Sequence, residues 1–293
     1  MLLTDIEFHE ANTLKEASDW MGRYAPNARL MAGGTDVLVD LKTGRYSTDH
    51  IVTLHRIAAL RGLKTTDGHL RIGTLTTPNQ LWEATTIWEK FPAILDAVRD
   101  MAVPQIRNMA TVGGNIAGAV PSGDLPPILM ALKASVILWS SSGEREVALE
   151  DFFVGPRQTV RKDDEILTEI RVPYPPARFG AAYAPFALRE ANGCAVAAVA
   201  ASLLLDEKGI IREARVCLGA VAPIPKLVKS VGAALVGKVA DAATFRKAAD
   251  EAKAATQPIS DIRSSADYRR ELVFILTRRA LETARERALG GRQ

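Results

Sequence analysis

Two pairs of adjacent glycines carry the residue types best suited to binding an anion. The first lies in Met31-Ala-Gly-Gly-Thr-Asp36 and the second in Ala110-Thr-Val-Gly-Gly-Asn115, each just after an apolar or extended segment. Adjacent glycines can adopt positive φ, expose successive backbone N–H groups and let a ligand approach without a Cβ clash. The hydroxyls of Thr35 and Thr111 and the amide of Asn115 add directional donors. Two such segments could hold the two halves of a diphosphate.

The spacing alone leaves two interpretations open. A single pair of adjacent glycines is more often a turn than a ligand site. Neither segment matches the Walker pattern or the G-x-G-x-x-G fingerprint, which disfavours a Rossmann-type NAD site.

These motifs, and their order in the chain, resemble those of one protein family. Ala32-Gly-Gly-Thr-Asp36 is followed by Arg107-Asn-Met-Ala-Thr-Val-Gly-Gly-Asn115, with Asp124-Leu125 nine residues further on. Together with Asp163-Asp-Glu-Ile-Leu-Thr-Glu-Ile-Arg-Val-Pro173, these strings resemble the FAD-binding (medium) subunit of molybdenum hydroxylases of the carbon monoxide dehydrogenase and xanthine dehydrogenase type. The similarity extends over nearly the whole chain.

The resemblance implies which residues bind the cofactor, FAD, and implies no catalytic residue in this chain. The first diphosphate loop would consist of Ala32, Gly33, Gly34, Thr35 and Asp36, and the second of Thr111, Val112, Gly113, Gly114 and Asn115. Asp124 would accept hydrogen bonds from ribityl or ribose hydroxyls, although it is equally well placed to cap the following helix. Leu167 would pack near the flavin or adenine and Met101 would contact the cofactor; without the resemblance both are ordinary core residues.

Three departures from the family pattern bear on the subtype. Thr35 stands where carbon monoxide dehydrogenases tend to have histidine, which weakens carbon monoxide as the substrate. Ala187 stands where xanthine dehydrogenase-like members often have lysine, so an electrostatic role of that lysine is absent or has moved to Arg189. The chain also lacks the cysteine-rich insertion that holds a four-iron cluster in some relatives.

The function implied by the resemblance is electron transfer within a complex. A large partner would carry the molybdopterin cofactor, and a small partner would carry two [2Fe–2S] clusters whose electrons pass through FAD to an external acceptor. Relatives form dimers of heterotrimers, and the expected location is the cytoplasm. Two alternatives are a stand-alone FAD-dependent oxidoreductase and a nucleotide-binding scaffold without redox function.

Composition restricts the other possibilities. The 293 residues include 37 basic and 34 acidic side chains, and no basic stripe indicates nucleic-acid binding. Two cysteines cannot supply four ligands for an iron–sulfur cluster. The longest uncharged apolar stretch, Cys194 to Leu205, is too short to span a membrane. The four histidines have no compact metal-ligand spacing, so no metal site is predicted, and Cys194 is predicted to be a buried, inert thiol.

Hydrophobic patterns predict the elements that position the two glycine segments. Before the proline-rich linker at Pro173 to Ala177, the helices are Thr13 to Tyr24, Val37 to Lys42, Pro78 to Arg99 in two pieces broken at Phe91-Pro92, and Pro126 to Leu132. The strands there are Arg29 to Ala32, His50 to Leu54, His69 to Thr74, a hairpin of Ser135 to Trp139 with Glu144 to Ala148, and Glu165 to Val172. Gln105 to Ala119 is predicted to be irregular, and Trp82 and Trp88 to lie on different faces of one helix.

The pattern changes after the linker. Ala195 to Leu205 and Ile210 to Leu218 are apolar strands joined by a short loop, and helical segments follow at Ala233 to Leu235, Ala242 to Ala255 and Tyr268 to Ala288. The chain is therefore predicted to be α+β, with domains at 1–175 and 178–290. By the resemblance, the first is a vanillyl-alcohol-oxidase-type (PCMH-type) FAD-binding domain of two α/β subdomains. The second is the family's C-terminal flavoprotein domain, an antiparallel sheet with helices.

Overall fold

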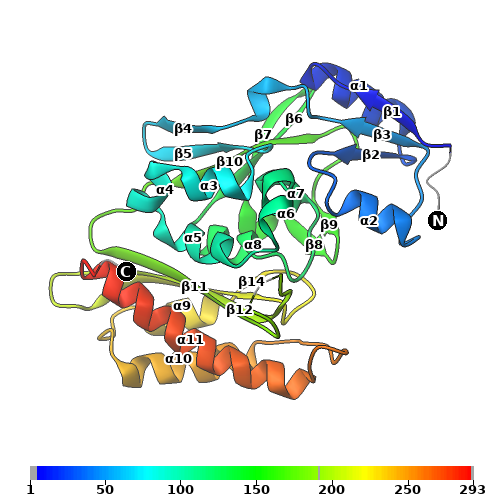
Figure 1. The fold of residues 1–293 in the computed structure, drawn as a ribbon. Coiled ribbons are helices and arrows are strands. Elements are labelled where there is room, and N and C mark those ends of the chain that lie inside the picture. Colours follow the sequence, from blue (N-terminus) through cyan, green and yellow to red (C-terminus); the bar gives the residue numbers. More distant parts are fainter. Residues whose placement is uncertain (1–4, 191, 292–293) are drawn as a thin grey trace.

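The N-terminal part of the fold is a small parallel sheet with a helix on each side. The computed structural model describes residues 5–190 and 192–291. The sheet has the order β1-β3-β2, formed by β1 (Glu7–Glu10), β3 (His50–Thr53) and β2 (Ala28–Met31). In Figure 1, α1 (Leu14–Tyr24) and α2 (Val37–Lys42) lie on opposite sides of it. Thr13 caps α1 as predicted, because its hydroxyl accepts a hydrogen bond from the backbone N–H of Glu16 at 3.1 Å.

A five-stranded antiparallel sheet follows, in the order β4-β5-β10-β6-β7. Its strands are β4 (Leu63–Thr66), β5 (His69–Gly73), β10 (Ile166–Pro173), β6 (Ser135–Ser140) and β7 (Gly143–Ala148). The predicted hairpin is confirmed as β6 and β7, which pair in antiparallel register. Three short elements complete this part: η1 (Ala58–Leu60), η2 (Leu149–Asp151) and the small hairpin of β8 (Phe153–Gly155) with β9 (Gln158–Thr159).

A layer of six short helices lies beneath that sheet (Figure 1). They are α3 (Pro78–Glu83), α4 (Thr85–Lys90), α5 (Pro92–Arg99), α6 (Pro104–Met109), α7 (Val112–Ala117) and α8 (Leu125–Ala131). The predicted break at Phe91-Pro92 is present, but a second break at Ala84 gives three pieces where two were predicted. The prediction that Gln105 to Ala119 is irregular is wrong. Pro104 in the first turn of α6 and the Thr111 cap of α7 start two helices there despite the glycines.

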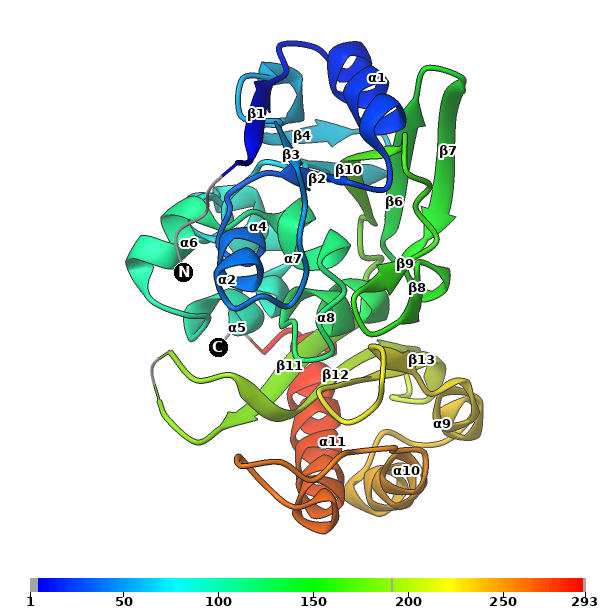
Figure 2. The same cartoon turned by 90° about the vertical axis from the view of Figure 1, so that its right-hand side faces the viewer.

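The C-terminal part is a four-stranded antiparallel sheet with three helices. The strand order is β11 (Phe179–Ala187), β12 (Ala195–Leu205), β13 (Ile211–Gly219) and β14 (Lys226–Leu227). One face of this sheet meets α5 and α8, and the other is covered by α9 (Lys229–Leu235), α10 (Ala242–Ala254) and α11 (Ala266–Ala288), as Figures 1 and 2 show. Coverage on both faces explains why β12 is almost entirely apolar. Strand β11 was not predicted from the sequence.

The hydrophobic core continues from the helical layer into the C-terminal sheet. One cluster of buried residues joins Ile94 and Leu125 of the helical layer to Ala181, Ala198 and Cys217 of the sheet. The fold is α+β, as predicted. The division at 1–175 and 178–290 falls between the end of β10 and the start of β11, but the two parts share this core.

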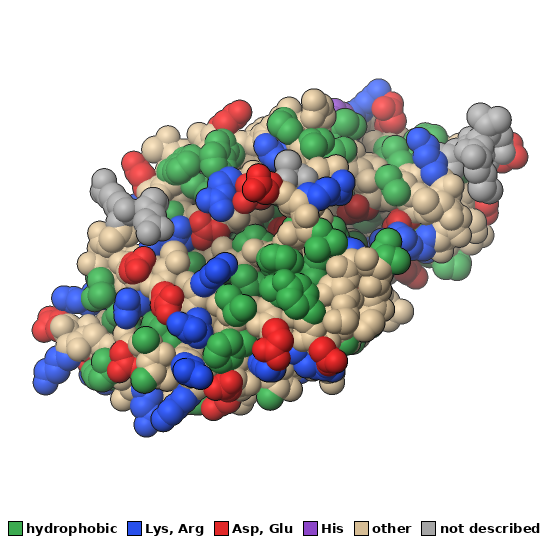
Figure 3. Space-filling model, turned by 60° about the horizontal axis from the view of Figure 1, so that its bottom comes forward, with side chains coloured by type: hydrophobic (Ala, Val, Ile, Leu, Met, Phe, Trp, Pro, Cys, Tyr) green, Lys and Arg blue, Asp and Glu red, His purple; other side chains and the backbone are tan. Residues whose placement is uncertain are grey.

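On the face shown in Figure 3, basic and acidic side chains are interspersed over the described residues. Among residues 5–190 and 192–291, no helix is both long enough and apolar enough to cross a membrane.

Candidate functional site

The two glycine segments come into direct contact. Ala32 to Asp36 joins the end of β2 to α2, and the second segment begins where α6 ends. A Cβ atom built on Gly33 would lie only 1.8 Å from the carbonyl oxygen of Met109 and 3.1 Å from the Cα of Ala110. Glycine at position 33 is therefore what allows the two segments to approach.

The first segment presents backbone donors. Gly34 has φ of +76°, which turns the chain sharply before α2. Among the residues that the structure describes, no hydrogen bond uses the backbone N–H of Gly33, Gly34, Thr35 or Asp36. Consecutive N–H groups in such a turn form a concave anion-binding surface. This part of the predicted geometry is present.

The second segment is the first turn of α7, and the prediction that it is a loop with free N–H groups is wrong. The N–H of Val112 donates to the carbonyl of Thr76 at 2.8 Å, and that of Gly113 donates to Thr74 at 2.9 Å. Thr111 is the N-cap, and its hydroxyl accepts from the N–H of Gly114 at 3.0 Å. The N–H groups of Val112 and Gly113 thus fasten α7 to the residues that follow β5, and the N–H of Gly114 is used by the N-cap.

Gly113 has a packing role in this arrangement. A Cβ on it would lie 1.5 Å from the hydroxyl oxygen of Thr74, so only glycine allows α7 to lie this close to the sheet. The side chain of Asn115, unlike the backbone N–H groups before it, is not used within the described chain. Its Oδ1 is buried and has no hydrogen-bond partner among the described residues. A buried carbonyl oxygen of this kind is suited to accepting from a ligand hydroxyl.

Charged residues lie behind the first segment. Asp40 is buried, and its carboxylate pairs with the guanidinium groups of both Arg45 and Arg157. Burial raises the pKa of Asp36, and the positive charge of Arg157 partly offsets that rise. Asp36 and Asp40 balance the charges of the two arginines, so the attraction for an anion at this turn comes from the backbone N–H groups.

A cavity of about 270 Å³ lies at the N-terminal end of α8, between the helical layer and the C-terminal sheet. Its polar lining includes Asp96, Asp100, Asp124, Tyr183 and Arg189, and its apolar lining includes Met101, Phe186 and Ala187. The side chain of Asp124 does not cap α8, because it makes no hydrogen bond to the backbone of that helix. Instead, its Oδ1 accepts from the Tyr183 hydroxyl at 2.9 Å.

Burial sets the protonation behaviour of this pair. It raises the pKa of Asp124 to about 6, an effect that the hydrogen bond from Tyr183 reduces and the negative charge of Asp100 increases. Burial also raises the pKa of Tyr183 well above its usual value, and the charge of Asp124 adds to that shift. Tyr183 therefore stays a hydrogen-bond donor, and Asp124 is an acceptor at neutral pH.

Short contacts connect the two glycine segments to the neighbourhood of Asp124, which lines the cavity. Asn115 Oδ1 lies 3.5 Å from the position that a Cβ on Gly123 would take, and Gly123 is the neighbour of Asp124. On the other side, Asp36 Oδ2 lies 3.8 Å from the equivalent position on Gly118. The polar groups therefore form one line that runs from the first segment past Asn115 to Asp124.

Not every predicted site residue lies on this line. Met101 lies in the cavity wall, but Leu167 is buried in the core on β10 and does not line the cavity. It is connected to the site only indirectly, since the next residue, Thr168, accepts from the N–H of Thr74 at 3.0 Å. Contact between Leu167 and a cofactor stays a prediction.

Sequence reasoning missed Tyr183 because it missed strand β11. The segment Phe179 to Ala187 is rich in alanine and lacks β-branched residues, so its β-propensity is weak. The aromatic residues at 179, 183 and 186 were the available signal that this segment packs against something.

Two predictions about other side chains are wrong. Cys194 is exposed, with Sγ 3.1 Å from both the Ser122 hydroxyl and an Arg263 nitrogen, because it precedes the buried strand β12. Trp82 and Trp88 belong to separate helices and contact each other edge to face, with ring centroids 4.9 Å apart. The break at Ala84 brings together two rings that one continuous helix would have kept apart.

The residues of this site fit the chemical groups of FAD. The free N–H groups of the first segment suit its diphosphate, and Gly33 keeps Cβ atoms out of the turn. The buried Asn115 oxygen and the Asp124 carboxylate suit the hydroxyls of its ribityl and ribose parts.

Comparison with known proteins identifies the family. Residues 4–175 match the family described as the FAD binding domain in molybdopterin dehydrogenase, and residues 182–284 match the CO dehydrogenase flavoprotein C-terminal domain. The carbon monoxide dehydrogenase medium chain of Afipia carboxidovorans is 33% identical over 288 residues, which cover 98% of this chain and 99% of that one. The xanthine dehydrogenase FAD-binding subunit of Escherichia coli O157:H7 is 33% identical over 279 residues, covering 94% and 95%.

Solved structures agree with this result. Carbon monoxide dehydrogenase from Hydrogenophaga pseudoflava superimposes with a TM-score of 0.93 at 31% identity, covering 97% of this chain and 98% of that one. Quinoline 2-oxidoreductase from Pseudomonas putida 86 gives a TM-score of 0.90 at 27% identity, covering 99% of each. The resemblance, the fold class, the cofactor and the oxidoreductase class inferred from the sequence are confirmed. The chain belongs to the family of FAD-binding subunits of molybdenum hydroxylases, oxidoreductases that include carbon monoxide dehydrogenase and xanthine dehydrogenase.

Proposed function

We propose that this chain holds FAD along the line from Gly33 to Asp124 and passes electrons through it within a three-subunit molybdenum hydroxylase. The single observation that carries the proposal is the contact of Gly33 with the backbone of Met109, next to unused N–H groups. That contact brings two segments that are distant in the sequence together at one binding surface. FAD supplies the redox chemistry when bound, and the protein supplies binding and orientation.

The proposed contacts follow from the geometry of each segment. Ala32, Gly33, Gly34, Thr35 and Asp36 bind the diphosphate, chiefly through backbone N–H groups. Val112, Gly113 and Gly114 act mainly by positioning, since their N–H groups are in hydrogen bonds, and Thr111 does so by capping α7, while Asn115 faces the ligand. Asp124 accepts from a hydroxyl, Met101 packs against the cofactor, and Leu167 supports the adenine or flavin from the core.

We propose that the electrons come from another chain. This chain has only two cysteines, Cys194 and Cys217, so it cannot ligate an iron–sulfur cluster with four cysteines. The proposal therefore includes a small partner with two [2Fe–2S] clusters and a large partner with the molybdopterin cofactor, assembled as a dimer of heterotrimers. It also includes a cytoplasmic location, which the unpaired state of both cysteines favours. The domain division at 1–175 and 178–290 is part of the proposal.

Reconstitution and co-purification test the proposal. The purified chain is incubated with FAD, desalted, and its flavin content is measured by absorbance; we expect one FAD for each chain. In parallel, the chain is isolated from its native host under mild conditions, and its partners are analysed for molybdenum, iron and sulfide. We expect a molybdopterin-containing large chain and an iron–sulfur small chain.

Two outcomes would favour the alternatives. If the isolated chain with FAD oxidised an organic substrate at the rate of the native preparation, it would be a stand-alone oxidoreductase. If it retained no flavin, the scaffold interpretation would replace the proposal.

A further inference from the structure

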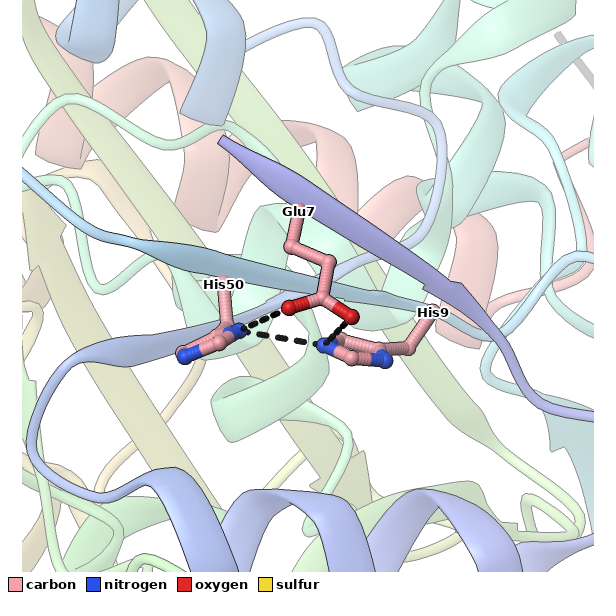
Figure 4. A group of neighbouring side chains, drawn as sticks. All are labelled: Glu7, His9 and His50. Carbon is pink, nitrogen blue, oxygen red and sulfur yellow. Dashed lines mark hydrogen bonds and ion pairs between the residues drawn. The ribbon is translucent and has the colours of Figure 1, made fainter. Parts of the chain in front are cut away.

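A second constellation of side chains lies on the N-terminal sheet. His9 and His50 are 41 residues apart in the sequence, so their spacing along the chain gave no sign of a shared site. Parallel pairing of β1 with β3 places Glu7 directly opposite His50, and His9 lies two residues further along β1. Residues two apart on a strand face the same side of the sheet. Glu7, His9 and His50 therefore converge, as Figure 4 shows.

The distances between their polar atoms match those between the ligands of one metal ion. His9 Nε2 lies 3.1 Å from His50 Nδ1 and 3.9 Å from Glu7 Oε1, and His50 Nδ1 lies 3.5 Å from Glu7 Oε2. Two ligands of tetrahedral Zn²⁺ with bonds of about 2.0–2.1 Å are separated by about 3.3 Å. The three distances bracket that value, although the two to Glu7 involve different carboxylate oxygens. One ligand atom from each residue lies within 4.8 Å of the other two, so a rotation of the exposed Glu7 side chain would bring one oxygen and both nitrogens into one coordination sphere.

Hydrogen bonding alone satisfies this group poorly. A carboxylate only accepts, and a neutral imidazole has one donor nitrogen and one acceptor nitrogen. His9 Nε2 and His50 Nδ1 face each other, so an N–H on one donates to the lone pair of the other, and neither atom has a proton left for the Glu7 carboxylate at the point where the three groups meet. A cation at that point would satisfy all three atoms at once.

Helix α1 holds both imidazole rings in place. The ring of Tyr24 stacks on His50 with centroids 3.9 Å apart, and it stacks on His9 at 5.0 Å. Trp20 contacts His9 from the same helix at 5.1 Å. His9 is only 9% exposed, whereas the Glu7 side chain is 65% exposed. The group is thus rigid on the side of α1 and open to water on the side of Glu7.

We propose that Glu7, His9 and His50 form a Zn²⁺-binding site. Two imidazole nitrogens and one carboxylate oxygen are a donor set that suits zinc, with water in the remaining position. The ion would link β1 to β3 and so stabilise the N-terminal sheet. The inference is independent of FAD binding, because none of the three residues belongs to the line from Gly33 to Asp124.

Calorimetric titration tests the proposal. The full chain, freed of any affinity tag and stripped of metal with a chelator, is titrated with ZnCl₂. We expect one saturable site for each chain and a rise in the melting temperature on addition of Zn²⁺. Loss of a supporting partner of a metal ligand costs 10–100-fold in affinity, so removing a ligand itself in His50→Gln should weaken binding by at least about 100-fold.

Two further variants make the result specific. Glu7→Gln changes a surface side chain, so its fold is not at risk, and it should abolish the Zn²⁺-dependent rise in melting temperature. His55→Gln removes an exposed histidine outside the group and should bind Zn²⁺ like the unmodified chain. The proposal is overturned if no saturable site is found, if Glu7→Gln and His50→Gln bind as tightly as the unmodified chain, or if His55→Gln weakens binding equally.

Discussion

Gly33 is the residue on which the approach of the two glycine segments depends. An added methyl group would meet the backbone carbonyl of Met109 at 1.8 Å, and backbone cannot rotate away as a side chain can. We expect Gly33→Ala to lower the free energy of unfolding by about 1–3 kcal/mol, the usual cost of overpacking. The displaced segment should also lose FAD. Urea unfolding and flavin content after desalting measure the two effects.

Gly22 provides the matched control for that substitution. It lies inside α1, and a Cβ there would meet only the Cβ of Asp164, at an ordinary 3.8 Å. Alanine is favoured over glycine within a helix by up to about 1 kcal/mol, so Gly22→Ala should be neutral or stabilising and retain full flavin. Equal flavin loss in both variants would contradict the role given to Gly33.

Asp124 should make the stability of the FAD-free chain depend on pH. Its pKa is about 6 in the folded chain against 3.8 for an unperturbed carboxyl, so the folded state binds this proton more tightly. Stability therefore falls as pH rises through the window between those two values. Because Asp124→Asn removes the ionisation, this variant should gain about 2 kcal/mol relative to the unmodified chain between about pH 4.5 and pH 7.5.

Urea unfolding of both FAD-free proteins at the two pH values measures this difference. Comparing the variant with the unmodified chain at each pH cancels the contributions of other titrating groups. A difference that is the same at both pH values would show that the environment of Asp124 does not raise its pKa.

At the scale of elements, α11 is fastened to the helical layer by one buried ion pair. Arg287 near the end of α11 donates to both carboxylate oxygens of Asp96 on α5, at 2.7 and 2.9 Å, and to the carbonyl of Ala181. The two side chains are 13% and 17% exposed. Removing the arginine leaves a mostly buried carboxylate unpaired, so Arg287→Met should cost about 3 kcal/mol of unfolding free energy.

Arg270 is the control on the same helix. Its pair with Asp267 is exposed, and such pairs contribute little. Arg270→Met should therefore change the unfolding free energy by less than about 0.5 kcal/mol. Similar losses in both variants, measured by urea unfolding, would mean that the ion pair between α11 and α5 has no special importance.

Elements with a strong local signal could be predicted, and those fixed by packing could not. The cap of α1, the hairpin of β6 and β7 and the long helix α11 each follow from capping residues or periodicity, and all are present. Strand β11 has no such pattern and exists because β12 and α11 cover it. Helix α7 contains two glycines, yet it forms because Thr111 caps it and Gly113 packs on Thr74.

At the scale of the whole molecule, the shared core should make unfolding a single transition. All four tryptophans, at positions 20, 82, 88 and 139, precede the linker, whereas the longest helices, α10 and α11, follow it. Tryptophan fluorescence therefore reports on the first part, and far-ultraviolet circular dichroism reports strongly on the second. Because one hydrophobic cluster spans both, the two urea curves should coincide. Separate midpoints would mean that the parts at 1–175 and 178–290 unfold independently.

The sequence by itself determined the class of fold and the family, and it predicted the residues around which we propose that the cofactor site is built. This was possible because short motifs such as Ala32 to Asp36 require particular residue types at adjacent positions. The tertiary structure alone decided how those motifs are used. In the folded chain, the N–H groups of Val112 to Asn115 in the second segment are in hydrogen bonds, and the Tyr183 hydroxyl donates to Asp124. His9 and His50 come together from two strands. Contacts between residues far apart in the chain depend on register and packing, which no local pattern records.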